Sequence, residues 1–174
     1  QASNCWYYRI MTENGQSIYN IITMKTKTQF FLELWLESRT RFTNQLENIT
    51  TADLTKKLPP SVNSVGFLIR HIGDVELLFA KNVFGAAEVK VVAKTVIDKY
   101  DSGEWTDLEG LKQYVNLSFD QLKTIVEKQT DEDWETTITT KEFGTKTKAE
   151  AFGRIVSHTA YHAGQLAIIN KYGK

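Results

Sequence analysis

The chain is 174 residues long, 41% of them hydrophobic and 24% charged, with 21 basic and 21 acidic side chains. This size and composition are those of one globular domain with a real core. The balanced charge gives no indication of a nucleic-acid or membrane-surface partner, and no apolar run approaches the length of a membrane span. The one cysteine, Cys5, excludes an internal disulfide and favours a reducing, cytoplasmic location.

The first 23 residues show neither helical periodicity nor the basic and apolar regions of a signal peptide. We expect a natural start at Met24, so that residues 1–23 are a leader or an added arm and residues 24–174 are the folded domain. The alternative is a genuine N-terminal arm that packs on the domain, because its aromatic and isoleucine side chains would prefer cover from water.

Apolar residues recur with a helical period in residues 27–49 and again in residues 61–84. Pro59 and Pro60 separate the two helices, because proline cannot continue a helix. Ser61 or Asn63 is the expected N-cap of the second helix, since both side chains can accept a hydrogen bond from a free backbone N–H.

Two further helices are predicted by capping boxes, in which a threonine and a glutamate three residues later satisfy each other's backbone N–H groups. One box is Thr106 with Glu109, followed by an apolar face that extends to Val126. The other is Thr147 with Glu150, followed by an apolar stripe that extends to Ile169.

The connections between these helices complete the predicted fold. Threonine-rich alternation predicts a short hairpin around residues 135–145. The connection at 85–105 is longer than is needed to join two adjacent antiparallel helices. It therefore fits a crossover that leaves the second and third helices parallel. We therefore expect an all-α fold, a four-helix bundle with a long connection between helices 2 and 3 and a short hairpin before helix 4.

All three histidines of the chain lie on the inward stripes of the predicted helices. His158 and His162 are four residues apart, so their Cβ atoms lie about 5–6 Å apart on one helical face. Together with His71 they predict a three-histidine site for one divalent metal, with coordination positions left open. The alternatives are ordinary core histidines with hydrogen-bond partners, or a chance pair.

Other sites are excluded by inspection of the sequence. It has no His-Glu-x-x-His and no Glu-x-x-His motif, which removes the zincin and di-iron bundle patterns. One cysteine cannot form a thiolate cage. Phosphate-binding loops, dinucleotide fingerprints and nucleophile elbows are also missing from the sequence.

Two segments carry a resemblance to a known family: SVGFLIRHIGDVELLFAKNVFG at 64–85 and AFGRIVSHTAYHAGQLAIINKYG at 151–173. They resemble the second and last helices of the DinB/YfiT-like metalloprotein superfamily, and the resemblance covers roughly residues 25–174. It implies a four-helix bundle, a divalent metal at His71, His158 and His162, and often a homodimer. Relatives in that superfamily include metal-dependent thiol transferases and a thiol-dependent isomerase.

The chemistry of such a site leaves the reaction open. Three neutral imidazoles do not compensate the charge of a divalent ion, so an anion is favoured at the open positions. Water bound to zinc has a pKa of about 7, and a bound thiol is likewise deprotonated. We therefore expect a hydrolase or a thiol-S-transferase that acts on a small molecule, with Zn, Ni, Fe or Mn as metal and a low-molecular-weight thiol as a candidate co-substrate. The alternative is a non-catalytic metal-binding or stress-response protein.

Three polar residues near the histidines are candidate supporting groups. Asp74 is expected to be a solvated or capping charge; the alternative is that it accepts a hydrogen bond from a ligand imidazole, directly or across a helix. Gln165 could orient water or substrate, or be a polar residue at the rim. Arg154 could hold an anionic substrate near the metal, or face solvent. Tyr161 and Trp35 are expected to pack rather than to act in catalysis.

Small residues recur every seven positions on two of the predicted helices. Gly66, Gly73 and Ala80 do so on the second helix, and Gly153, Ala160 and Ala167 on the fourth. Glycine inside a helix costs about 1 kcal/mol relative to alanine, so close backbone approach would offset that cost. We expect a homodimer that uses one of these faces; packing within the chain and coincidence are the alternatives.

Overall fold

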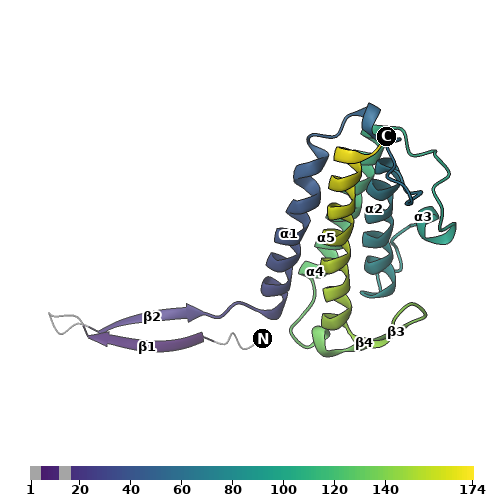
Figure 1. The fold of residues 1–174 in the computed structure, drawn as a ribbon. Coiled ribbons are helices and arrows are strands. Elements are labelled where there is room, and N and C mark those ends of the chain that lie inside the picture. The colour runs from purple at the N-terminus through teal and green to yellow at the C-terminus, as the bar shows by residue number, and fades with distance from the viewer. Residues whose placement is uncertain (1–4, 12–16) are drawn as a thin grey trace.

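The computed structural model of this chain describes residues 5–11 and 17–174, with side chains from residue 24 onward. Its long helices are α1 (Lys27–Leu46), α2 (Val65–Asn82), α4 (Leu108–Glu127) and α5 (Lys148–Tyr172) (Figure 1). The prediction of an all-α fold is therefore confirmed. None of the helices in the described ranges is long and apolar enough to cross a membrane.

The long helices pack side by side, with α2 and α4 running in one direction and α1 and α5 in the other (Figure 1). One cluster of buried residues joins the first halves of α2 and α4 to the last halves of α1 and α5, and a second cluster joins the opposite halves. The connection after α2 therefore runs back along the molecule before α4 begins, as its length predicted.

The start of α2 differs from the predicted one. Its N-cap is Ser64, whose side chain accepts a hydrogen bond from the backbone N–H of Phe67. The backbone N–H of Ser64 donates in turn to Asp101 in the long connection, over 2.9 Å. Ser61 and Asn63 thus lie before the helix, and the prediction that one of them caps it is wrong because this tertiary contact selects Ser64.

The other helix starts give one correction and one confirmation. At α4 the cap is Asp107, whose carboxylate accepts from the N–H of Gly110 over 3.1 Å. The predicted box of Thr106 and Glu109 therefore does not form, because the helix begins one residue later. At α5 the box that begins with Thr147 is confirmed.

Two short elements lie between the long helices. The connection from α2 to α4 contains the four-residue helix α3 (Lys94–Ile97), which the sequence did not predict. The hairpin before α5 consists of β3 (Thr137–Thr140) and β4 (Gly144–Thr147), an antiparallel pair that confirms the predicted hairpin with a small shift. Both elements lie beside the histidines or line the pocket that leads to them.

The N-terminal segment forms a separate hairpin of two antiparallel strands, β1 (Cys5–Met11) and β2 (Ser17–Thr23). In Figure 1 this hairpin extends from the start of α1 rather than lying between the long helices. The expected cover for its aromatic side chains falls outside the described residues, since no side chain before residue 24 is described.

The small-residue stripe of α2 faces the interior of its own chain. A Cβ atom on Gly66 would clash with the carbonyl oxygen of Trp105, and one on Gly73 would lie 2.8 Å from the ring of Tyr114. Ala80, the last member of the stripe, is fully buried. The prediction that this stripe meets a second subunit is therefore wrong: the close approach it permits is to α4 and to the segment before it.

The corresponding stripe of α5 is on the surface. Gly153, Ala160 and Ala167 are all exposed, and a Cβ atom added to Gly153 would have no neighbour within 4 Å. A homodimer through this face stays a prediction.

A buried ion pair joins α1, α2 and α4. The Arg39 guanidinium donates to the Glu76 carboxylate over 2.8 and 3.3 Å, and the two side chains are 5% and 0% exposed. Arg39 also donates to the Val115 carbonyl and to the Thr43 hydroxyl, while Ser118 donates to Glu76. The pair is therefore held by further hydrogen bonds on both sides, which is what a buried ion pair needs in order to persist.

Candidate metal centre

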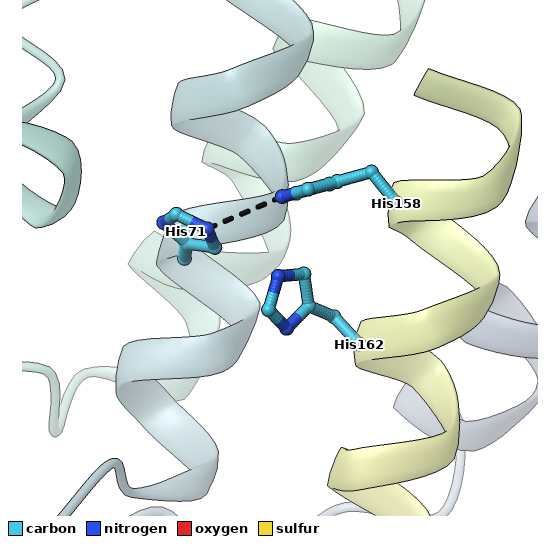
Figure 2. A group of neighbouring side chains, drawn as sticks. All are labelled: His71, His158 and His162. Atoms are coloured by element: carbon cyan, nitrogen blue, oxygen red, sulfur yellow. Dashed lines mark hydrogen bonds between the residues drawn. The ribbon is translucent and has the colours of Figure 1, made fainter. Parts of the chain in front are cut away.

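The three histidines lie together between two helices. His71 comes from α2, and His158 and His162 come from consecutive turns of α5 (Figure 2). One ring nitrogen of each lies within 4.8 Å of the corresponding nitrogens of the other two. The juxtaposition that the sequence predicted is thus present. It brings His71 together with two histidines that follow it in the chain by 87 and 91 positions.

Helix geometry explains this convergence. α2 and α5 are antiparallel, so the first half of α2 lies beside the second half of α5. His71 follows the buried Leu68 by three residues, and the α5 pair lies between the buried residues Ile155 and Leu166. Each ring therefore starts on the edge of an apolar stripe and points toward the neighbouring helix.

The orientation of the His71 ring is fixed by Thr95 on α3. The Nδ1 atom of His71 lies 3.1 Å from the Thr95 hydroxyl oxygen. That hydroxyl donates its one proton to Asp74 over 2.7 Å, so it can only accept from the imidazole. His71 must then carry its proton on Nδ1, which leaves the Nε2 lone pair facing the other histidines.

Asp74 is a fully buried carboxylate that organises this side of the site. It accepts from the Thr95 hydroxyl and backbone N–H, from the Tyr114 hydroxyl over 2.6 Å, and from Arg70 over 2.9 Å. Burial is the main cause that raises the pKa of Tyr114, followed by its hydrogen bond to Asp74, so this phenol stays a donor. The expectation that Asp74 is a solvated charge is wrong, because it is fully buried; it reaches His71 through the Thr95 hydroxyl rather than by accepting from the imidazole directly.

His162 is held by its own helix. Its Nδ1 atom lies 2.7 Å from the side-chain oxygen of Gln165, an acceptor, so Nδ1 carries the proton. The amide nitrogen of Gln165 donates in turn to the Tyr161 hydroxyl over 3.0 Å. Gln165 therefore orients a candidate ligand, and contact with water or substrate stays a prediction.

His158 is the member without a supporting partner. Its Nε2 atom lies 3.2 Å from Nε2 of His71 (Figure 2), while its Nδ1 atom is buried and has no hydrogen-bond partner among the described residues. In tetrahedral zinc sites with Zn–N bonds of about 2.0–2.1 Å, neighbouring ligand nitrogens are about 3.3 Å apart. The spacing of these two Nε2 atoms fits a shared cation and, without a metal, a hydrogen bond from His158 to His71.

Burial keeps the imidazoles neutral at neutral pH. It is the main cause that lowers the pKa of His71 to about 4 and that of His158 to about 3, and the neighbouring histidines lower both further. Burial also lowers the pKa of His162. Neutral imidazole is the form that binds metals, so the three rings are ready ligands without first losing a proton.

The histidines line an open pocket of about 770 Å³ between α2, α5, α3 and the tip of the β3–β4 hairpin. Arg154 and Tyr161 also line it. Tyr161 is 64% exposed, which corrects the expectation that it is a packing residue. Trp35 is fully buried in the core, so the packing role expected for it is confirmed.

Sequence reasoning missed Thr95 because it lies in a connection without periodicity, and nothing near it in sequence is a histidine. It also missed the hairpin tip, residues 140–143, as a wall of the pocket. Only the folded chain places these segments beside α2 and α5.

The chain belongs to the DinB superfamily, whose family model matches residues 34–166. That match includes all three histidines and most of the four long helices. No curated protein sequence is significantly similar to the chain.

Solved structures share the fold at low sequence identity. A mycothiol-dependent maleylpyruvate isomerase has a TM-score of 0.63 and 16% identity, covering 82% of this chain and 63% of the isomerase. A DinB-like protein from Bacillus subtilis has a TM-score of 0.61 and 18% identity, covering 81% of this chain and 90% of that protein. A conserved protein from Enterococcus faecalis has a TM-score of 0.61 and 17% identity, covering 85% of this chain and 97% of that protein. The chain thus spans less than two thirds of the isomerase.

Proposed function

We propose that this protein is an enzyme that binds one divalent metal ion through His71, His158 and His162 and transfers a thiol to a small electrophilic substrate. The observation that carries the proposal is the convergence of three neutral imidazoles at the wall of an open pocket. A purely structural metal site would be closed by a fourth protein ligand, whereas a catalytic site keeps a position open.

The supporting residues favour metal binding over three ordinary core histidines. Thr95 and Gln165 accept the Nδ1 protons of His71 and His162, and partners of this kind fix the tautomer and orientation of ligating histidines. The unpartnered His158 is costly to bury without a ligand, at about 1–3 kcal/mol for one unsatisfied polar atom.

A thiol is favoured over water as the nucleophile. A divalent ion held here would act as a Lewis acid that lowers the pKa of either group. A thiol starts from a pKa of about 8.5, so only a small lowering of that pKa makes it a thiolate at neutral pH. Water usually also needs a positioned base, and the one carboxylate that lines the described pocket is Glu142, which is 71% exposed on its side chain. The fold shared with a thiol-dependent isomerase adds support by analogy alone.

The test is a pair of assays on the metal-reconstituted chain. A Co²⁺-loaded sample is titrated with a small thiol while its visible spectrum is recorded, and the same sample is then given the thiol with an aryl halide. We expect a thiol-dependent spectral change and halide release faster than with the metal-free chain. Ester hydrolysis without thiol dependence would assign a hydrolase instead, and no response in either assay would support a non-catalytic binding protein.

A further inference from the structure

The pocket extends well beyond the histidines. Helix rise places Arg154 about 6 Å along α5 from His158 and about 12 Å from His162. The hairpin tip, residues 140–143, closes the same end of the pocket as Arg154. A ligand that reaches from the histidines to this end is therefore a chain of several bonds rather than a single small ion.

The middle of the pocket is apolar. Val75, Leu78, Phe79 and Val83 line it from the α2 side, and Phe143 lines it from the hairpin. These side chains offer no hydrogen bonds, so they suit an aliphatic or aromatic segment of a ligand.

The far end of the pocket is cationic. Arg154 and Lys141 both line it, and Glu142 is the one acidic neighbour there among the described lining residues. The Arg154 guanidinium is stacked on Phe143 at 5.0 Å. It forms an ion pair with the Glu142 carboxylate at 3.7 Å, too long for a hydrogen bond, and the two side chains are 45% and 71% exposed, so the pair is weak. Its fork of donors is thus positioned but unused by the described residues.

The other arginines near the core differ in this respect. Arg39 donates to Glu76 and to the Val115 carbonyl, and Arg70 donates to Asp74. Both of these guanidinium groups donate hydrogen bonds to buried carboxylates. Arg154 lines the pocket and has only the exposed ion pair with Glu142, and a planar guanidinium is well suited to a carboxylate.

We propose that the substrate or thiol co-substrate is a small organic carboxylate, with its anionic group bound by Arg154 and Lys141 and its apolar chain against the α2 wall. Its reacting end then lies at the histidines. This inference rests on the proposed function for what happens at that end, but the anion subsite is a property of Arg154 and the hairpin alone.

The first test compares two thiols of equal length, 6-mercaptohexanoate and 6-mercapto-1-hexanol, by titration of the Co²⁺-loaded chain at fixed ionic strength. We expect the carboxylate to bind at least about tenfold more tightly, because a charge-assisted hydrogen bond is gained. In Arg154→Gln the preference should fall to about twofold. The attraction of the metal for an anion is the same in both proteins, so the difference reports Arg154.

Two further variants sharpen the comparison. Arg41→Gln removes an exposed arginine of α1 that does not line the pocket, and it should keep the full preference. Glu142→Gln removes the carboxylate that competes for Arg154, so it should increase the preference. Equal affinities for the two thiols in the wild-type chain, or an unchanged preference in Arg154→Gln, would overturn the proposal.

A measurement without metal separates this inference from the proposed function. Hexanoate is added to the metal-free chain, and the NMR signal of the Arg154 Nε–H, assigned by its loss in Arg154→Gln, is followed. A saturable shift with hexanoate that hexanol does not produce supports the anion subsite even if no metal binds. An unmoved Arg154 signal, with Co²⁺ bound normally in the parallel sample, would refute the subsite and leave the metal site standing.

Discussion

The two sides of α2 carry polar clusters of opposite character. On the side toward α1 and α4, Glu76 and Arg39 form a buried ion pair whose hydrogen bonds are supplied by Val115 and Ser118. On the side toward α5, His71 meets the two α5 histidines with its Nε2 lone pair directed at theirs.

The two clusters differ in how fully their hydrogen-bonding groups are paired within the protein. Among the described residues, the ion pair is buried and four of the five N–H donors of Arg39 have acceptors. The histidine cluster matches two of its Nδ1 protons with Thr95 and Gln165, yet directs acceptor atoms toward one another beside a pocket. A saturated buried polar cluster stabilises a fold, whereas convergent lone pairs are stable only when a cation or proton is shared between them.

The largest expected effect is a loss of stability when the Arg39–Glu76 ion pair is broken. Glu76→Ala leaves Arg39 buried without its carboxylate, and breaking a buried pair in this way costs about 3–5 kcal/mol of unfolding free energy. Urea denaturation of the metal-free protein measures it. Glu127→Ala, which removes one partner of the exposed pair with Lys123, is the matched control and should change stability by less than about 0.5 kcal/mol.

The comparison would fail if Glu76→Ala cost as little as this control. It would also fail if the variant, once folded, lost its metal, because the two sides of α2 would then not be separate. Arg39→Met combined with Glu76→Leu should recover much of the lost stability, since a buried pair is replaceable by apolar packing.

A smaller effect, on metal affinity, is expected when the hydrogen bond that orients His71 is removed. Thr95→Val removes the hydroxyl that accepts from His71 and donates to Asp74. We expect metal affinity to fall about 10–100-fold, the usual range for partners of ligating histidines. Competition with a chromophoric chelator measures the affinity.

Thr95→Ser keeps the hydroxyl and is the matched variant, so it should bind metal within about threefold of wild type. Equal affinities in the valine and serine variants would show that this hydrogen bond does not position the ligand.

The last expected effect is the pH dependence of stability in the metal-free chain. The pKa of His71 is about 4 and that of His158 about 3 in the folded protein, against about 6.5 in the unfolded chain. Below pH 6.5 the unfolded chain therefore binds more protons, so stability falls as the pH falls from 6.5 toward 5. The slope is at most about 1.4 kcal/mol per pH unit for each histidine.

Urea denaturation at several values between pH 5 and 7.5 measures this slope, in a window above the ordinary carboxylate range. The double variant His71→Gln/His158→Gln should show a much shallower profile there, with His162 as the remaining buried histidine. A wild-type profile equally flat would mean that the buried imidazoles are not held neutral by the fold.

The sequence was sufficient to predict the fold class and the three histidines. Both rest on local periodicity, since a four-residue spacing on a helix determines which side chains share a face. Thr95 and the Arg39–Glu76 pair depend on how distant segments meet, and no local pattern encodes them. The small-residue stripe of α2 shows the same limit: glycine spacing indicated close packing, but not that Trp105 and Tyr114 of the same chain occupy that face.

The central claim is that convergent imidazoles on one side of α2 bind a metal ion. The most direct measurement is elemental analysis after reconstitution with Zn²⁺ and gel filtration, for wild type, Ser157→Ala and His158→Ala. Ser157 lines the same pocket from the same helix without joining the cluster. We predict about one zinc ion per chain in the first two proteins and far less in folded His158→Ala. A wild-type chain that retains no zinc, or a His158→Ala variant that retains as much as wild type, would contradict the account.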